Sequence, residues 1–479
     1  MTGSVDAREY LASQPPERPL PGALEEIRRR VETSGRKVAV LDDDPTGTQT
    51  VHDVPVLTTW SVEDLRWALE QPSPTFYVLT NSRSLPEDEA YAMNLEVAFN
   101  LVAAAEITGK EFVVTSRGDS TLRGHFPAET DALAEALAEG TGGGVDGVIL
   151  CPCYLEAGRL TAEDTHWVRQ GEHLVPAGET EFARDASFGY AASDLRDWVE
   201  EKTAGRFKAS DVVGVGLADI REGGPDRVSG ILRGVEGGRP VVVNAASYAD
   251  LEVFVLGLLD AEEAGKRFLY RTGPSFVRAR GGISEKGPLT AEELYRRRSH
   301  HGHGLVLVGS HVALTTRQLE EALKLDGVRA VELSVPRLLE DAEREGELAR
   351  VAAEVNSGLT GSEVVVYTSR EVVGGGPGWT GFEVGRAVSD ALVEVMRLVD
   401  RGAPLAFVVA KGGITSSDVG TRGLDVRRAE VAGQMLPGLV SVWVLPEESA
   451  FPGLPYVIFA GNVGGPDSLA RVIEILRGD

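Results

Sequence analysis

Cysteine is scarce in this sequence, with two residues among 479. Cys151 and Cys153 are separated by a single residue, so they cannot crosslink distant elements. No second pair is present to complete a zinc site of the usual spacing. The cysteine content therefore favours a protein that works in a reducing compartment, and we expect it to be cytoplasmic.

Positive charge is also in short supply, because 48 Lys and Arg residues face 73 Asp and Glu residues, for a net charge of -25. Nucleic acids and anionic membranes bind basic surfaces, so neither is an expected partner. No apolar run is long enough to cross a bilayer, and residues 1–30 lack a signal-type apolar core. Small molecules therefore remain as the expected partners. The sequence does not determine the oligomeric state, and a homo-oligomer is possible.

The sequence is rich in apolar runs that alternate with amphipathic segments. Such alternation predicts an α/β protein of two domains, each a mainly parallel sheet flanked by helices. We expect a loose N-terminal arm over residues 1–36, a first domain over 37–277, a linker over 278–303 and a second domain over 304–479. Residues 158–190 have no clear period, and we interpret them as an insertion lying over the first sheet.

Three apolar runs in the first half end in polar turns. The carboxyl ends of parallel strands share one edge of a sheet, where ligands bind, so these turns are expected to converge. Their candidate substrate-binding residues are Asp43, Asp44, Thr46, Gly47, Arg83, Arg117, Asp119, Ser120 and Arg123. Guanidinium groups bind carboxylates and Asp accepts from hydroxyls, so the mixture suits a small polyhydroxy acid. The alternative is that Arg and Asp only pair with one another in surface loops.

Glycine-rich turns follow three apolar runs in the second half, at residues 309–311, 411–418 and 461–466. Glycine lets backbone N–H groups approach a phosphate closely. No Walker A loop and no dinucleotide fingerprint stands in the right setting, so glycines alone are weak evidence for a nucleotide. The missing fingerprint also disfavours a nicotinamide-dependent oxidoreductase.

Four motifs resemble those of the four-carbon acid sugar kinases, from about residue 38 to the end of the chain. The first two are Asp43-Asp44-Pro45-Thr46-Gly47, similar to D-D-x-T-G, and Asp119-Ser120-Thr121-Leu122-Arg123-Gly124, similar to D-S-T-L-R-G. The others are a Gly-Gly-x-Thr-Ser turn at 412–416 and a Gly-Asn-x-Gly turn at 461–464. Pro45, Arg117 and Ile414 depart from the common family residues, which bears on the choice of sugar acid.

The resemblance implies a sugar-acid-binding domain followed by a nucleotide-binding domain, with the active site in the cleft between them. The implied reaction is ATP-dependent phosphorylation of the terminal hydroxyl of threonate, erythronate or a 3-oxo-tetronate. Candidate ATP-binding residues are Ser310, Lys411, Gly412, Gly413, Ile414, Thr415, Ser416, Gly461 and Asn462.

For the mechanism, we expect Asp44 to accept the proton of the substrate hydroxyl, with Asp43 or Asp119 as the second choice. Mg²⁺ is expected to bridge the phosphates of ATP, although the sequence does not assign its protein ligands. A non-catalytic sensor that binds sugar acid and nucleotide is the alternative function. Three carboxylates in the first pocket disfavour it, because an anion-binding site has little need of them.

Overall fold

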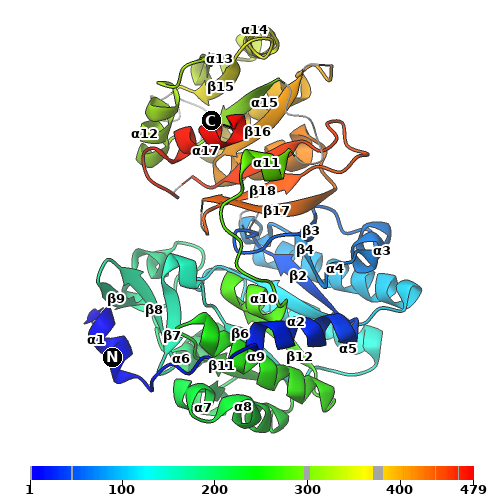
Figure 1. The fold of residues 1–479 in the computed structure, drawn as a ribbon, viewed down its shortest axis with the longest axis vertical. Helices are drawn as coiled ribbons and strands as arrows, with labels where there is room; N and C mark the ends of the chain where they lie inside the picture. Colours follow the sequence, from blue (N-terminus) through cyan, green and yellow to red (C-terminus); the bar gives the residue numbers. More distant parts are fainter. Residues whose placement is uncertain are drawn as a thin grey trace. The chain divides into compact units, whose positions relative to one another are not determined.

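The computed structural model describes residues 3–44, 47–295, 302–369, 381–402, 404–436, 438–461 and 463–478. The chain forms two compact units (Figure 1). The first contains the chain up to residue 50 and residues 55–285, and the second contains residues 51–54 and the chain from 286 onward. No helix in the described ranges is long and apolar enough to cross a membrane.

The N-terminal unit is built on a parallel sheet with the strand order β10-β11-β6-β12-β5-β2-β4-β3. Each neighbouring pair in this order is parallel. The strands are β2 (Lys37–Asp42), β3 (Val54–Leu57), β4 (Thr75–Leu79), β5 (Phe112–Arg117), β6 (Gly147–Cys151), β10 (Val213–Val215), β11 (Arg239–Val243) and β12 (Phe268–Thr272).

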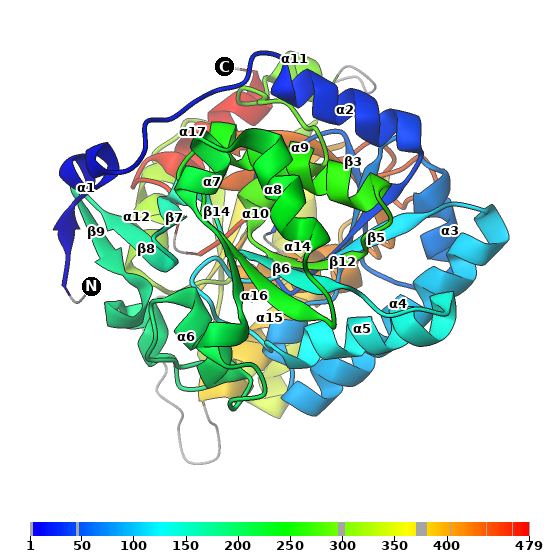
Figure 2. The ribbon, with the colours of Figure 1, turned by 90° about the horizontal axis from the view of Figure 1, so that it is seen from below.

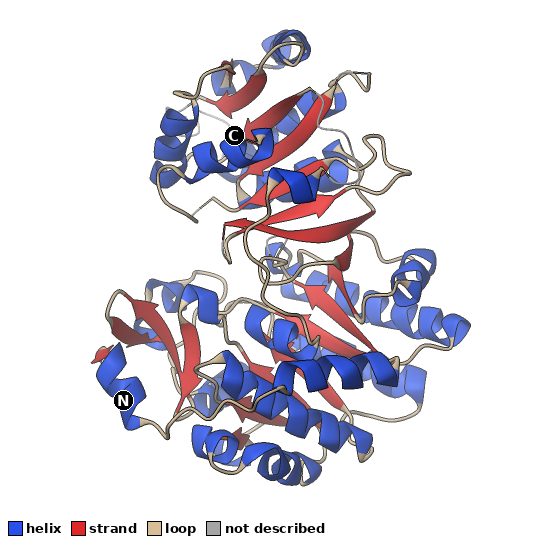
Figure 3. Ribbon diagram, in the orientation of Figure 1, coloured by secondary structure: helices blue, strands red, loops and turns tan. Residues whose placement is uncertain are grey.

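Helices cover both faces of this sheet, as Figures 2 and 3 show. Successive side chains of a strand point to opposite faces, so Phe268 and Tyr270 enter one core and Leu269 enters the other. The helices of the first core are α2 (Ala23–Ser34), α7 (Leu217–Arg221), α8 (Gly224–Arg233), α9 (Tyr248–Glu263) and α10 (Pro274–Arg280). The second core has α3 (Val62–Glu70), α4 (Glu87–Thr108) and α5 (Ala128–Thr141). Coverage on both faces explains why the strands are almost continuously apolar.

The N-terminal segment is packed, in contrast to the loose arm that we expected. Strand β1 (Val5–Asp6) pairs with β9 (His173–Pro176), and it leads into helix α1 (Ala7–Ser13). In the amphipathic helix α2, Ile27 and Val31 are buried in the first core. The apolar stripe of α2 is therefore part of the sheet's cover.

Most of the stretch without a clear period forms a small antiparallel sheet with the order β1-β9-β8-β7. Its main strands are β7 (Arg159–Ala162), β8 (Thr165–Gln170) and β9 (His173–Pro176). Trp167 is fully buried and its ring centroid lies 4.9 Å from that of Tyr10. Helix α6 (Leu195–Lys202) follows. Strands β7 and β8 are buried along most of their length and not at alternate residues, so they give no alternating pattern in the sequence.

The C-terminal unit has the strand order β17-β18-β19-β16-β13-β15-β14. Strands β19, β16, β13, β15 and β14 are parallel, whereas β17 and β18 run antiparallel to their neighbours in this order. The strands are β13 (His303–Val308), β14 (Val328–Leu333), β15 (Glu363–Thr368), β16 (Leu405–Lys411), β17 (Arg428–Leu436), β18 (Val440–Val444) and β19 (Pro455–Phe459).

Helices also flank the second sheet. Helices α12 (Ala313–Ala322) and α17 (Ser468–Arg477) share a core with Val306 of β13 and Phe407 of β16. The other helices are α11 (Ala291–Leu294), α13 (Val335–Leu338), α14 (Asp341–Gly358), α15 (Gly381–Arg397) and α16 (Gly413–Asp418). The two units confirm the predicted class, an α/β protein with two mainly parallel sheets flanked by helices.

The packing of α2 predicts that Ile27→Ala destabilises the N-terminal unit by roughly 2–5 kcal/mol, because Ile27 is 0% exposed and truncation leaves a cavity. Ile107→Ala is the matched control, since Ile107 on α4 is 59% exposed and its truncation should cost less than about 0.5 kcal/mol. Urea unfolding followed by circular dichroism measures both. Equal midpoints for the two variants would show that α2 is not part of the core.

Candidate functional site

Three parallel strands bring polar turns together at one edge of the N-terminal sheet. Asp42, the last residue of β2, lies opposite Leu79 of β4 and Arg117 of β5. Beyond the strands, the Asp43 backbone N–H donates to the carbonyl of Arg117 at 3.2 Å. The Arg83 backbone N–H donates to the carbonyl of Asp43 at 3.4 Å. The main chain itself therefore holds the three turns side by side.

Arg83 is the cation at the centre of these turns. Its guanidinium forms an ion pair with Asp44 and lies 3.7 Å from Oδ1 of Asp119 and 3.9 Å from Oδ1 of Asp43. Burial disfavours the charged form of Asp119, but Arg83 and Arg123 outweigh it and lower the pKa of Asp119 to about 2. Asp119 is therefore an anion at neutral pH.

The other two predicted arginines also have carboxylate partners. Arg117 Nη1 lies 3.0 Å from Oδ1 of Asp42, and both side chains are buried. Arg123 Nε lies 2.6 Å from Oδ2 of Asp119, and its Nη1 lies 3.7 Å from Oδ2 of Asp185. The pairing that we weighed as an alternative thus occurs, but among buried and half-buried side chains at one edge of the sheet.

Asp43 differs from its neighbours because neither of its buried side-chain oxygens has a hydrogen-bond partner among the described residues. Burial raises its pKa to about 6, against the opposing effect of Arg83 and with a further rise from Glu129. Gly124 allows this crowding: it has φ +122°, and a Cβ there would lie 3.0 Å from Oδ2 of Asp43. Asp43 is therefore a carboxyl group that can gain or lose a proton near neutral pH.

Two further charged residues belong to this edge and were not predicted. Arg271 Nη1 donates to Oγ of Ser116 at 2.8 Å and lies 2.5 Å from Oε2 of Glu129. Arg271 is near the end of β12, which pairs with β5, and a Thr-Gly-Pro turn follows it. A turn after an apolar run is the same signal that indicated the turns after β2, β4 and β5, so Arg271 could have been predicted from the sequence. Glu129 lies in the first turn of α5, where an acidic residue is common at any helix start and gives no such signal.

The remaining predicted residues of this site are close to the same turns. A Cβ at Gly47 would overlap the Asp42 carboxylate, so only glycine fits there. The backbone carbonyl of Ser120 accepts a 2.7 Å hydrogen bond from Nε2 of His166, which ties the turn to the small sheet. Thr46 lies outside the described residues.

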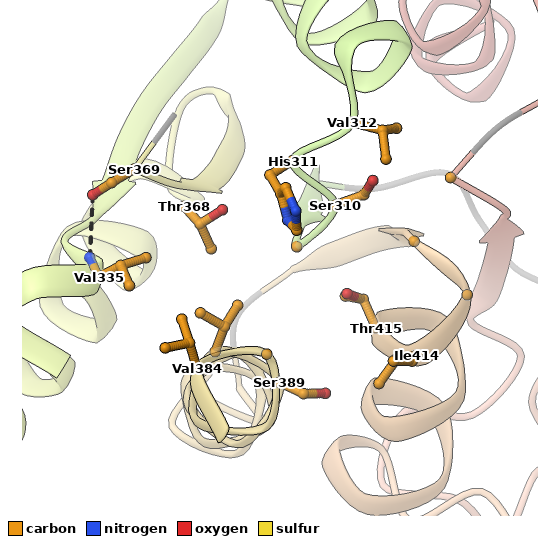
Figure 4. Close-up of a pocket in the computed structure, with 16 residues that line it drawn as sticks. Ser310, His311, Val312, Val335, Thr368, Ser369, Val384, Ser389, Ile414 and Thr415 are labelled. Atoms are coloured by element: carbon orange, nitrogen blue, oxygen red, sulfur yellow. Dashed lines mark hydrogen bonds between the residues drawn. The ribbon is translucent and has the colours of Figure 1, made fainter. Parts of the chain in front are cut away.

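The C-terminal unit contains a cavity of about 430 Å³ at the carboxyl ends of its central strands (Figure 4). This volume falls in the range of small-molecule sites. The lining residues are Gly309, Ser310, His311, Val312, Val335, Thr368, Ser369, Val384, Gly385, Val388, Ser389, Gly412, Gly413, Ile414, Thr415 and Gly461. They come from the turns after β13, β15, β16 and β19, together with α13 and α15.

The cavity has an apolar part and a polar part. Val384 of α15 and Ile414 present apolar side chains to the cavity, and Ile414 is 70% exposed. Ser310 and Thr415 present hydroxyl groups, and the imidazole of His311 points into the cavity between them and Thr368 (Figure 4). A flat base and a polyphosphate need this combination of surfaces.

Gly412 is the residue that shapes the turn after β16. Its φ of +127° lies in a region that L side chains rarely adopt, and a Cβ there would come within 3.1 Å of Oγ1 of Thr415. The chain then enters α16 at Gly413 without the bulk of a side chain. The Gly412 N–H donates to the carbonyl of Phe459 at 2.8 Å, so Gly412 contributes the shape of the turn, and Gly413 and Ile414 after it line the cavity.

Lys411 does not line the cavity, although we predicted it among the ATP-binding residues. Its Nζ is buried and donates to the carbonyls of Ala460 at 2.6 Å and Gly461 at 3.2 Å. It also lies 3.8 Å from the ring centroid of Phe459. Burial lowers the pKa of Lys411 to about 7. Lys411 therefore fastens the turn after β19 and holds Gly461 at the cavity.

Ser416 is also turned away from the cavity, since its hydroxyl donates to the carbonyl of Ala410 at 2.7 Å. Asn462 lies outside the described residues. The other predicted residues of this set, Ser310, Gly412, Gly413, Ile414, Thr415 and Gly461, line the cavity together. The sequence did not indicate Val335, Thr368 or the residues of α15, because they come from elements without a glycine-rich turn.

Asp43→Asn should stabilise the protein at pH 8. The folded-state pKa of Asp43, about 6, is above the ordinary 3.8, so the folded state holds the proton more tightly. Stability is therefore lost as pH rises from about 4 to about 6, and the loss is complete above that range. The neutral amide avoids this cost, which is roughly 1–3 kcal/mol.

Thermal unfolding at pH 5 and pH 8 checks this prediction, with a larger gain in melting temperature at pH 8. Asp44→Asn is the control, because Asp44 is more exposed and is ion-paired with Arg83. An Asp43→Asn variant that melts at or below the parent temperature at pH 8 contradicts the assignment of Asp43 as a buried carboxyl group with a raised pKa.

Comparison with known proteins gives matches for both units. A sugar-binding N-terminal domain matches residues 38–280, and a nucleotide-binding C-terminal domain matches residues 305–469. The first match contains the charged edge at the end of β2, and the second contains the cavity.

Individual relatives match along most of the chain. A D-erythronate kinase from Heliobacterium modesticaldum is 26% identical over 417 residues, which are 83% of this chain and 86% of that protein. A D-threonate kinase from Salmonella typhimurium is 26% identical over 320 residues, 66% of this chain and 67% of that protein. The crystal structure of a Haemophilus influenzae protein shares the fold, with a TM-score of 0.67 at 18% identity, covering 91% of this chain and 100% of that one. The chain belongs to the four-carbon acid sugar kinase family, a family of carbohydrate kinases.

Proposed function

We propose that this protein transfers the γ-phosphoryl group of ATP to the terminal hydroxyl of a four-carbon sugar acid, namely threonate, erythronate or a 3-oxo-tetronate. The observation that carries the proposal is the group of carboxylates around Arg83 at the end of β2, in a chain that also has a nucleotide-sized cavity. The erythronate and threonate kinase activities named for two relatives agree with this substrate class.

The charged edge supplies what a hydroxy acid needs. Arg83 and Arg123 offer N–H groups to substrate oxygens, while Asp43, Asp44 and Asp119 accept from hydroxyls. Because Asp119 is held as an anion, it can only accept. A sugar acid is thus oriented by both donors and acceptors.

We assign the proton acceptor for the attacking hydroxyl to Asp44. Its side chain is 22% exposed, whereas that of Asp43 is 2% exposed, so a substrate hydroxyl can reach Asp44 more directly. As the hydroxyl oxygen forms a bond to the γ-phosphorus, its proton passes to the Asp44 carboxylate and ADP leaves with the electron pair of the broken bond. Asp43 and Asp119 remain the second choices.

In the C-terminal cavity, the backbone N–H groups of Gly413 and Gly461 would bind the phosphates, and the apolar part would bind the base. The Gly412 N–H already donates to the carbonyl of Phe459, so Gly412 would shape the turn. Catalysis requires the γ-phosphate to reach the hydroxyl that the N-terminal unit binds, with water excluded. Among the described residues, no group of three His, Cys, Asp or Glu side chains could hold a metal. Mg²⁺ would therefore arrive with the ATP phosphates and supply charge neutralisation there.

A coupled ADP-release assay tests the proposed function. Threonate, erythronate and 3-oxo-tetronate should be compared with threitol and erythritol, the polyols of equal length without a carboxylate. We expect ADP release that depends on at least one of the acids and not on the polyols. No substrate-dependent ADP release with any acid would contradict the kinase proposal and favour the non-catalytic sensor.

Asp44→Asn tests the assigned proton acceptor. We expect its kcat to fall by roughly 10²- to 10⁴-fold, because the amide cannot accept the proton, while its affinity for ATP is kept. Asp131→Asn is the control, since Asp131 pairs with Arg206 on the surface. Steady-state kinetics and nucleotide binding by calorimetry measure the two quantities. A kcat for Asp44→Asn equal to that of the parent would show that another group takes the proton.

A further inference from the structure

The arginines that the sequence nominated for the substrate carboxylate already have protein partners. Arg117 is paired with Asp42, and Arg83 with Asp44. Arg123 shares Asp119 with Arg83 and also faces Asp185. A substrate carboxylate at these arginines would compete with protein carboxylates already in place, which weakens its binding.

Arg159 is different. It is the first residue of β7, in the small antiparallel sheet, and it is half-buried. No carboxylate in the described part of the chain forms an ion pair with it. One Nη1 donor is used by the backbone carbonyl of Ala157, and its Nε is buried without an acceptor. A guanidinium has five N–H donors, so several remain for an external anion.

Arg159 also lies close to two of the predicted substrate-binding residues, Asp119 and Arg123. Its Cζ is 5.9 Å from the ring centroid of Phe182, and Arg123 Cζ is 5.2 Å from the same centroid. Burial lowers the pKa of Arg159, while the nearby charge of Asp119 raises it. Arg159 is therefore close to the D-S-T-L-R-G turn, which contains Asp119 and Arg123.

The backbone and its neighbours hold Arg159 there. Its N–H donates to the carbonyl of Tyr154 at 2.9 Å, and the Tyr154 N–H returns a 3.0 Å bond to the carbonyl of Arg159. The Tyr154 hydroxyl donates at 3.3 Å to Oε1 of Gln49, which follows the turn that contains Asp43 and Asp44. His166 of the adjacent strand β8 bonds Ser120, as described above. The segment from Tyr154 to His166 is thus fastened to two of the turns that form the charged edge.

We propose that Arg159 binds the carboxylate of the sugar-acid substrate, so that the small sheet determines the preference for acids over neutral sugars. The inference rests on the proposed function and adds a residue outside the motifs. A half-buried guanidinium without a counter-ion costs free energy, which a bound carboxylate repays through two parallel N–H···O bonds. Arg83 and Arg123 then orient the hydroxyl groups and the acidic side chains.

The experiment is calorimetric binding of erythronate, threonate and a 3-oxo-tetronate, each compared with its neutral amide. The parent, Arg159→Met, Arg159→Lys and Arg169→Met are measured side by side. Arg169 is the matched control because it is an exposed arginine on β8 of the same sheet. We expect Arg159→Met to weaken acid binding by roughly 10- to 100-fold, the range for hydrogen bonds to charged groups. Amide binding should stay within about threefold, and Arg159→Lys should lose less than Arg159→Met.

The acid and amide comparison separates a direct role from a structural one. Equal acid affinity in Arg159→Met and the parent overturns the inference, and so does an equal loss for acid and amide. If Arg159→Met fails to fold, the same comparison with Arg159→Lys decides the question. If the parent binds none of the three acids, the inference falls with the proposed function. If the parent binds and phosphorylates an acid without the Arg159 effect, the inference alone fails.

Discussion

The charged edge at the end of β2 is the constraint on which the rest of the N-terminal unit depends. Asp42 and Asp43 are buried there, and a buried carboxylate is tolerated only with compensating charge or a bound proton. Arg117 compensates Asp42, while burial raises the pKa of Asp43 to about 6. The parallel strands, the close approach at Gly47 and the attached small sheet all keep these groups in place.

Within the ranges that the structure describes, the cavity of the C-terminal unit is lined without Lys, Arg, Asp or Glu side chains. The cavity is formed by glycine turns, hydroxyl groups and valines, and the buried lysine of this unit acts on the backbone of the turn after β19. Backbone N–H groups can bind phosphates without adding basic residues to a chain of net charge -25. The two sites therefore suit different ligands, a hydroxy acid in one unit and a nucleotide in the other.

Much of this arrangement could be predicted from the sequence, because parallel strands covered on both faces are almost continuously apolar and end in distinctive turns. Residues after such strands, such as Asp43 or Gly412, were thus placed at the correct edge of a sheet. Side-chain direction could not be predicted, which is why Lys411 was expected in the cavity that it only supports. Partners such as Glu129 and Arg159 come from a helix and from a short strand without a readable period.

We expect the two units to serve one phosphoryl transfer. The direct measurement is incubation of the protein with erythronate or threonate and ATP that carries ¹⁸O in its γ-phosphate, followed by mass spectrometry and ³¹P NMR of the products. We expect one labelled phosphate on the terminal oxygen of the sugar acid, in equal amount to the ADP formed. Label found only in free phosphate, or only in unreacted ATP, would contradict it.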